Sequence, residues 1–133
     1  MREKWSKIGH TLLNILLVVS LLCALSIGVT SITSRKPSVF GFRVLNIMSA
    51  SMEPTIMTDQ LVLGKVTDGS EIVIGDIVAY RESDGLRRTI IHRVIDIYEN
   101  DGVTYYVFQG DNNKIPDEDP IAADMLLYKI IWY

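Results

Sequence analysis

Hydrophobic and polar positions divide the chain into two parts with different periodicities. From Ile8 to Ser34 the sequence contains no Asp, Glu, Lys or Arg, and it is rich in leucine, isoleucine and valine. A helix over this stretch is about 40 Å long at ~1.5 Å per residue, enough to cross a ~30 Å hydrocarbon core with some tilt. The pattern therefore predicts a transmembrane anchor at residues 8–34, preceded by a short tail at residues 1–7.

A cleaved secretory signal is the alternative interpretation of this segment, because small residues occur around residues 26–30. The apolar core of such a signal is only ~7–15 residues long, so the length of the segment favours a retained anchor. Trp5 and the basic residues of the tail fit a cytoplasmic membrane interface, although Arg35 and Lys36 lie on the far side. We expect a single-pass membrane protein with a cytoplasmic N-terminus and an extracytoplasmic domain.

Beyond this segment the helical periodicity ends, and short β-branched runs alternate with turn residues. This pattern is typical of a mainly β, antiparallel domain, which we expect over residues 35–133. Asp101-Gly102 between two apolar runs predicts a hairpin, and Ser83-Asp84-Gly85 predicts another turn. The predicted strands are residues 42–48, 60–66, 77–81, 89–98, 103–109 and 125–132.

Charge is unevenly distributed between the two parts. Residues 1–36 carry five basic and one acidic residues, whereas residues 37–133 carry eight basic and fifteen acidic residues, a net charge of −7. A net acidic domain argues against nucleic-acid binding, which requires a basic surface. The single cysteine, Cys23, excludes an intrachain disulfide, and Cys23, His10 and His92 cannot form a metal cluster.

The stretch Met-Ser-Ala-Ser-Met-Glu-Pro-Thr at residues 48–55 follows the first predicted strand. Pro54 fixes its own φ and favours extended backbone at Glu53, so this loop can hold a serine hydroxyl in one place, as a nucleophile requires. Serine and proline are also common in ordinary turns, and local composition alone favours that interpretation.

His92 is the only histidine of the predicted β domain. A lone histidine within a strand is more often structural than catalytic. A serine nucleophile needs a base that is neutral at working pH, however, and an imidazole, whose ordinary pKa is ~6.5, meets this requirement. A polar loop at residues 109–120 supplies several carboxylates. Its composition also fits an acidic surface loop or a weak cation site, but its spacing does not match a calcium loop.

These stretches resemble the sequence boxes of the type I signal peptidases. Ser-Ala-Ser-Met-Glu-Pro-Thr is similar to the nucleophile box, which implies Ser51 as the nucleophile and Ser49 beside the oxyanion site. His-Arg-Val at residues 92–94 resembles the base box of the branch found in the endoplasmic reticulum, archaea and some Gram-positive bacteria. The larger bacterial branch carries lysine in this role, and the lysines of this domain lie in no matching context: Lys65, Lys114 and Lys129.

Gly-Asp-Asn-Asn at residues 110–113, with a further aspartate six residues on, resembles the last box of the histidine branch. The match implies Asp111 as a supporting residue and Asp117 as the acid that works with His92. Asp119 is a nearby competitor for this role. A carboxylate there would orient the imidazole and stabilise its charged form, as in serine hydrolases on unrelated folds.

The resemblance implies a mostly β catalytic domain that rests on the outer membrane leaflet and needs no metal or cofactor. It implies a membrane-bound serine endopeptidase that removes signal peptides from secretory pre-proteins after small residues at positions −1 and −3. The expected partners are these pre-proteins, the lipid bilayer and the protein-translocation machinery, and no nucleic acid. Members of this branch often have a second membrane segment near the C-terminus, whereas this chain stops at Tyr133, which implies a short form or a truncated one.

Two other function classes are compatible with parts of the pattern. A catalytically weak, membrane-anchored binding or assembly factor for secreted or pilus subunits would not need Ser51, His92 and Asp117 together. A self-cleaving regulator of the serine–lysine type, with a related β fold, would need a lysine base and a DNA-binding module. The apolar segment stands where that module would be.

Overall fold

The computed structural model describes residues 2–33, 36–82 and 88–133, with the side chains of the first helix described from Lys7 onward. The chain divides into two compact units, Met1–Gly41 and Phe42–Tyr133. The first unit contains the helix α1 (Arg2–Thr33). Its stretch Lys7–Thr33 has a mean hydropathy of 2.6 and is long and apolar enough to cross a membrane.

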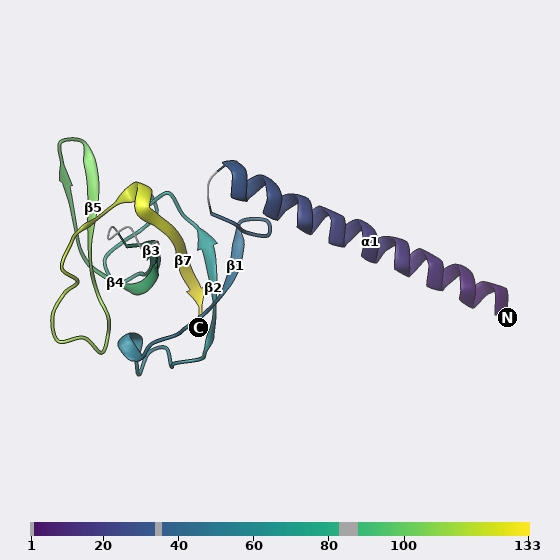
Figure 1. Cartoon of the computed structure of the whole chain (residues 1–133), viewed down its shortest axis with the longest axis horizontal. Coiled ribbons are helices and arrows are strands. Elements are labelled where there is room, and N and C mark those ends of the chain that lie inside the picture. The colour runs from purple at the N-terminus through teal and green to yellow at the C-terminus, as the bar shows by residue number, and fades with distance from the viewer. Residues whose placement is uncertain (1, 34–35, 83–87) are drawn as a thin grey trace. The chain divides into compact units, whose positions relative to one another are not determined.

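Within the described residues, the second unit is built on an antiparallel sheet of seven strands in the order β1-β2-β7-β3-β4-β5-β6. Figure 1 shows these strands curling around one another, and the prediction of a mainly β, antiparallel domain is confirmed. Two short 3-10 helices interrupt the strands, η1 (Ala50–Met52) and η2 (Ala123–Met125). The strands are β1 (Phe42–Asn46), β2 (Leu61–Val66), β3 (Ile77–Arg81), β4 (Thr89–Asn100), β5 (Val103–Gln109), β6 (Ile121–Ala122) and β7 (Leu126–Trp132).

All six predicted strands are present, with ends that differ by no more than two residues from the prediction. β6 was not predicted, because two residues are too few to show an alternating pattern. Asp101 and Gly102 both have positive φ, 50° and 75°, as the predicted tight hairpin between β4 and β5 requires. The predicted turn at Ser83-Asp84-Gly85 lies outside the described residues.

β3 is buried on both of its faces and joins two hydrophobic cores. Side chains alternate along a strand, so Ile77 and Ala79 pack into one core while Val78 and Tyr80 pack into the other. The first core lies between β3 and the strands β1, β2 and β7. The second lies between β3 and the strands β4 and β5. The candidate catalytic residues come from segments that border both cores.

Candidate active site

The candidate nucleophile, Ser51, lies in η1, the single 3-10 turn that follows β1. Met52 beside it is 1% exposed and anchors the turn in the first core. Glu53 has φ −66° and ψ 145°, the extended geometry expected before Pro54, and its amide donates to the carbonyl of Ala50. Packing on one side and proline on the other therefore hold the Ser51 loop in place.

His92 lies on β4, and its imidazole contacts the hydroxyl of Ser51. Its Nε2 is 3.0 Å from the Ser51 Oγ, although the two residues are 41 positions apart in the sequence. His92 is opposite Val78 of β3 in the ladder and is 7% exposed. Its Nδ1 is 2.6 Å from Asp117 Oδ2. The structure thus brings the three residues into one hydrogen-bonded chain.

Asp117 reaches His92 because the loop after β5 folds back along that strand. The Asp117 amide donates to the carbonyl of Phe108 at 2.8 Å. Burial raises the pKa of the Asp117 carboxyl, but hydrogen bonds from His92 and from Tyr80 outweigh burial and hold this pKa below its ordinary value. Asp119, the competitor for this position, is exposed.

Ser49 and Asp111 lie at different positions around the hydrogen-bonded side chains of Ser51, His92 and Asp117. Ser49 Oγ lies 3.2 Å from Ser51 Oγ, so its hydroxyl borders the nucleophile directly. The Asp111 carboxylate receives two hydrogen bonds from the Arg93 guanidinium, at 2.8 and 2.6 Å, and one from the Thr55 hydroxyl. Asp111 therefore joins β4 to the nucleophile loop.

The loop that carries Asp117 is also tied to Ser51 through backbone contacts. The Asn112 amide donates to the carbonyl of Ser51 at 2.9 Å, and its side-chain nitrogen donates to the carbonyl of Ala50 at 3.0 Å. A Cβ at Gly110 would lie 2.6 Å from the Ser51 carbonyl oxygen, so only glycine allows this approach. Ser51 and Asp117 are thus held by two loops that brace each other.

Four residues of the site were not given a role by sequence reasoning: Tyr80, Arg93, Thr55 and Asn112. Arg93 and Asn112 lie inside the boxes His-Arg-Val and Gly-Asp-Asn-Asn, and Thr55 ends the nucleophile box. Their presence in these motifs is the sequence signal for a supporting role. Tyr80 lies in the predicted strand at residues 77–81, and a strand pattern gives no sign of a polar partner.

A groove of about 590 Å³ leads to Ser51 and His92. The extended segment from Leu45 to Ser49 forms one wall, with Met52, and the segment from Arg88 to His92 forms the other. β1 is at the edge of the sheet, and the pairing of β4 with β5 begins at Arg93, beyond the groove. Among the described residues, the sheet therefore pairs no further strand with the outer edge of β1 or with the second edge of residues 89–92 of β4.

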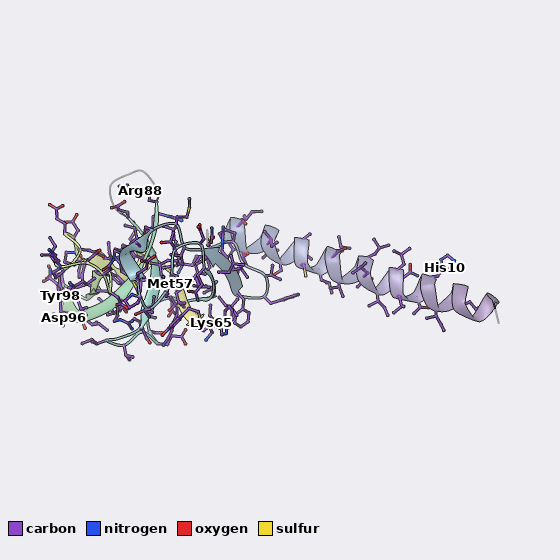
Figure 2. The ribbon with its side chains drawn as sticks, turned by 90° about the horizontal axis from the view of Figure 1, so that it is seen from below. His10, Met57, Lys65, Arg88, Asp96 and Tyr98 are labelled. Atoms are coloured by element: carbon purple, nitrogen blue, oxygen red, sulfur yellow. The ribbon has the colours of Figure 1, made fainter. Side chains whose placement is uncertain are left out.

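The lysines and the second histidine lie in other surroundings. Lys65 is 3.2 Å from Glu71, and Lys129 is 2.7 Å from Asp76. Figure 2 shows Lys65 on the opposite side of the β domain from Arg88, which lines the groove. His10 is exposed on α1 (Figure 2). Within residues 2–33, 36–82 and 88–133, no group of three His, Cys, Asp or Glu side chains is placed to hold a metal ion.

The ion pair of Asp111 and Arg93 leads to a prediction about acid stability. Hydrogen bonds from Arg93 hold the pKa of Asp111 below its ordinary 3.8, against the opposing effect of burial. The pair therefore stabilises the fold above that value, and this stability is lost as pH falls through the lower folded pKa. Asp111→Asn should reduce the free energy of unfolding at neutral pH by about 1–3 kcal/mol, and by much less near about pH 2.

The measurement is denaturant unfolding of the full chain in detergent at both pH values. Asp119→Asn is the matched control, because it removes the same charge from an exposed position of the same loop. We expect Asp119→Asn to change stability little at either pH. Equal losses in the two variants would contradict a stabilising role for the Asp111 contacts.

A serine hydroxyl next to an imidazole, with the imidazole bonded to a half-buried carboxylate, resembles the arrangement found in serine hydrolases. The comparisons with known proteins agree with this class. No protein-family model matches the sequence. Signal peptidase I W of Bacillus subtilis (strain 168) is 32% identical over 116 residues, which are 84% of this chain and 60% of that protein.

Two fungal proteins are similar as well. The signal peptidase complex catalytic subunit sec11 of Schizosaccharomyces pombe is 35% identical over 91 residues, 56% of this chain and 48% of that protein. The corresponding subunit of Colletotrichum graminicola is 32% identical over 114 residues, 85% of this chain and 63% of that protein. The chain thus spans between 48% and 63% of the length of these curated relatives.

These similarities confirm the resemblance that the motifs predict. The chain is a relative of the type I signal peptidases, in the branch shared by the endoplasmic reticulum, archaea and some Gram-positive bacteria. Together with the apolar helix α1, this relationship indicates a membrane-anchored protein.

Proposed function

We propose that this chain is a membrane-bound serine endopeptidase that removes signal peptides from secreted pre-proteins. The observation that carries the proposal is the hydrogen-bonded chain of Ser51, His92 and Asp117 at the end of an apolar groove. Neither a groove nor a lone polar cluster would favour peptide hydrolysis as strongly as the two together. A binding or assembly factor would need the groove but not the bonded side chains.

In the proposed reaction, Ser51 Oγ attacks the scissile carbonyl carbon while His92 Nε2 takes its proton. The charged imidazole keeps its Nδ1–H bond to Asp117, which orients the ring and stabilises its positive charge. Ser49, whose hydroxyl is 3.2 Å from the nucleophile, donates to the oxyanion that forms. His92 then protonates the leaving amine. Water next attacks the acyl-enzyme while His92 takes a proton from it, and His92 returns this proton to the departing Ser51 oxygen.

The groove suits a substrate in extended conformation. The outer edge of β1 and the second edge of residues 89–92 of β4, which pair with no further strand in the part of the chain that the structure describes, can form main-chain hydrogen bonds to an added strand. Buried Ile47 and Met52 line it near Ser51, and we expect them to restrict the neighbouring substrate position to small side chains. Side chains alternate along a strand, so positions −1 and −3 enter the groove while position −2 points away.

The orientation in the membrane follows the charge pattern of the ends of α1. Basic residues and Trp5 at the N-terminal side support a cytoplasmic N-terminus, with a single crossing and the β domain outside. Pre-proteins leave the translocation machinery on that outer side, so the machinery is a proposed neighbour of this chain. The pre-proteins then emerge at the membrane surface on which the β domain lies.

Substrate selection at position −1 tests the proposal. We expect purified full-length protein in detergent to cut a pre-protein with alanine at −1 and −3. Phenylalanine at −1 should reduce the rate by about 100-fold or more, because a clash in a shaped pocket costs several kcal/mol. The assay is gel separation of precursor and mature protein over time.

Phenylalanine at −2 is the matched control, because the same side chain then points out of the groove. It should leave the rate within about threefold of the alanine substrate. Equal rates for phenylalanine at −1 and −2 would contradict the pocket. Binding of the alanine substrate without any cleavage would favour the assembly factor.

A further inference from the structure

The buried hydroxyl of Tyr80 contacts the site but has no part in the reaction as proposed. It donates to Asp117 Oδ2 at 2.5 Å, the same oxygen that lies 2.6 Å from His92 Nδ1. Tyr80 is 2% exposed, and its ring stacks on Phe108 with centroids 4.3 Å apart. The phenol is thus fixed by packing, with its hydroxyl directed at the carboxylate.

A buried tyrosine hydroxyl needs a partner in any protein, so burial alone does not assign a role. Tyr106, in the same core, shows the ordinary case: it is 3% exposed and donates to the backbone carbonyl of Gly69 at 2.9 Å. Tyr80 differs in its acceptor. Its hydroxyl and the His92 imidazole bond to the same oxygen of Asp117. The hydroxyl therefore changes the negative charge that lies beside the imidazole.

We propose that Tyr80 is a positioning residue, which fixes the Asp117 carboxylate and reduces the negative charge that this carboxylate presents to His92. This inference rests on the proposed function, in which His92 is the base. A carboxylate beside an imidazole favours the charged, inactive form of the free base. By donating to the same carboxylate oxygen, Tyr80 weakens this effect of Asp117 on the imidazole.

The protonation states of the two partners agree with this role. Burial raises the pKa of the Tyr80 phenol, and the hydrogen bond to Asp117 raises it further, so the phenol stays a donor at every working pH. The lowered pKa of Asp117 keeps that group an acceptor, despite its burial. The hydrogen bond therefore runs from phenol to carboxylate while His92 titrates.

Two other charged pairs surround the triad. Glu82 acts on Tyr80 and is 2.8 Å from Arg88, and Asp111 interacts with His92 and is paired with Arg93. The hydroxyl that Tyr80→Phe removes bonds to Asp117 and belongs to neither pair. A change in the titration of His92 in that variant can therefore be assigned to the lost hydrogen bond to Asp117.

The test uses the full chain in detergent micelles and follows the His92 ring by NMR from about pH 4 to 9. The chain has two histidines, so a His10→Gln variant assigns the signals. Tyr80→Phe should raise the midpoint of the His92 titration by about 0.5–1 pH unit, because Asp117 then presents more charge. Asp117→Asn should lower the midpoint, and Tyr106→Phe, the matched loss of a buried hydroxyl, should leave it unchanged.

The acid limb of kcat/KM should move with these midpoints, upward in Tyr80→Phe and downward in Asp117→Asn. The plateau rate of Tyr80→Phe should fall by about tenfold, as for the loss of one hydrogen bond to a charged group. A midpoint in Tyr80→Phe equal to that of Tyr106→Phe would overturn the inference. A shifted midpoint in a protein that cleaves nothing would support the inference about Tyr80 and overturn the proposed function instead.

Discussion

Replacing Ser51 by alanine is expected to reduce cleavage of a pre-protein by ~10⁴-fold or more, because the reaction loses its attacking atom. The fold should persist, since the change removes one hydroxyl from a turn that is anchored by buried Met52. The measurements are single-turnover cleavage and circular dichroism of the full chain. If Ser51→Ala lost the circular dichroism spectrum of β structure together with its activity, Ser51 would be a structural residue and not the nucleophile.

Ser49→Ala is the control for that variant, because it removes the neighbouring hydroxyl 3.2 Å away. Its rate should fall by ~10²–10³-fold, as for the loss of one donor to the oxyanion. A silent Ser51→Ala combined with an inactive Ser49→Ala would reverse the two assignments.

Replacing His92 by alanine should reduce cleavage by a similar ~10⁴-fold, because Ser51 then loses the imidazole that lies 3.0 Å from its Oγ. The parent kcat/KM should also fall in acid solution, as the imidazole becomes protonated and loses the ability to accept a proton. Cleavage by the parent and by His92→Ala is measured across about pH 5 to 9.

Lysine variants separate this site from the serine–lysine mechanism. Lys65→Ala and Lys114→Ala should cleave at the parent rate, because Lys65 is paired with Glu71 and Lys114 is exposed. Substantial activity in His92→Ala, or its loss in a lysine variant, would assign the base to a different group. A rate that does not depend on pH in the parent would argue against His92 as well.

The strands could be predicted because β-branched runs and turn residues alternate clearly in this sequence. Asp101-Gly102 determined the hairpin between β4 and β5, since both residues adopt positive φ. β6 could not be predicted, because two residues carry no period. Its position depends on pairing with Tyr105 and Tyr106 of β5, which is a tertiary interaction.

The candidate site was predictable as a set of residue types but not as a set of contacts. Asp119 lies two positions after Asp117, and spacing alone could not decide between them. The choice depends on the path of the loop, which the backbone bond from Asp117 to Phe108 directs. Tyr80 is 37 residues from Asp117 in sequence, and its strand pattern predicts burial without naming an acceptor.

The brace between the two loops also determines when the site is complete during synthesis. Asn112 holds the backbone on both sides of the Ala50–Ser51 bond from 62 residues away, and Asp117 comes later still. A nascent chain can therefore form β1 and expose Ser51 long before that serine has its carboxylate partner. The order of residues along the chain delays assembly of the site until nearly the whole β domain has emerged.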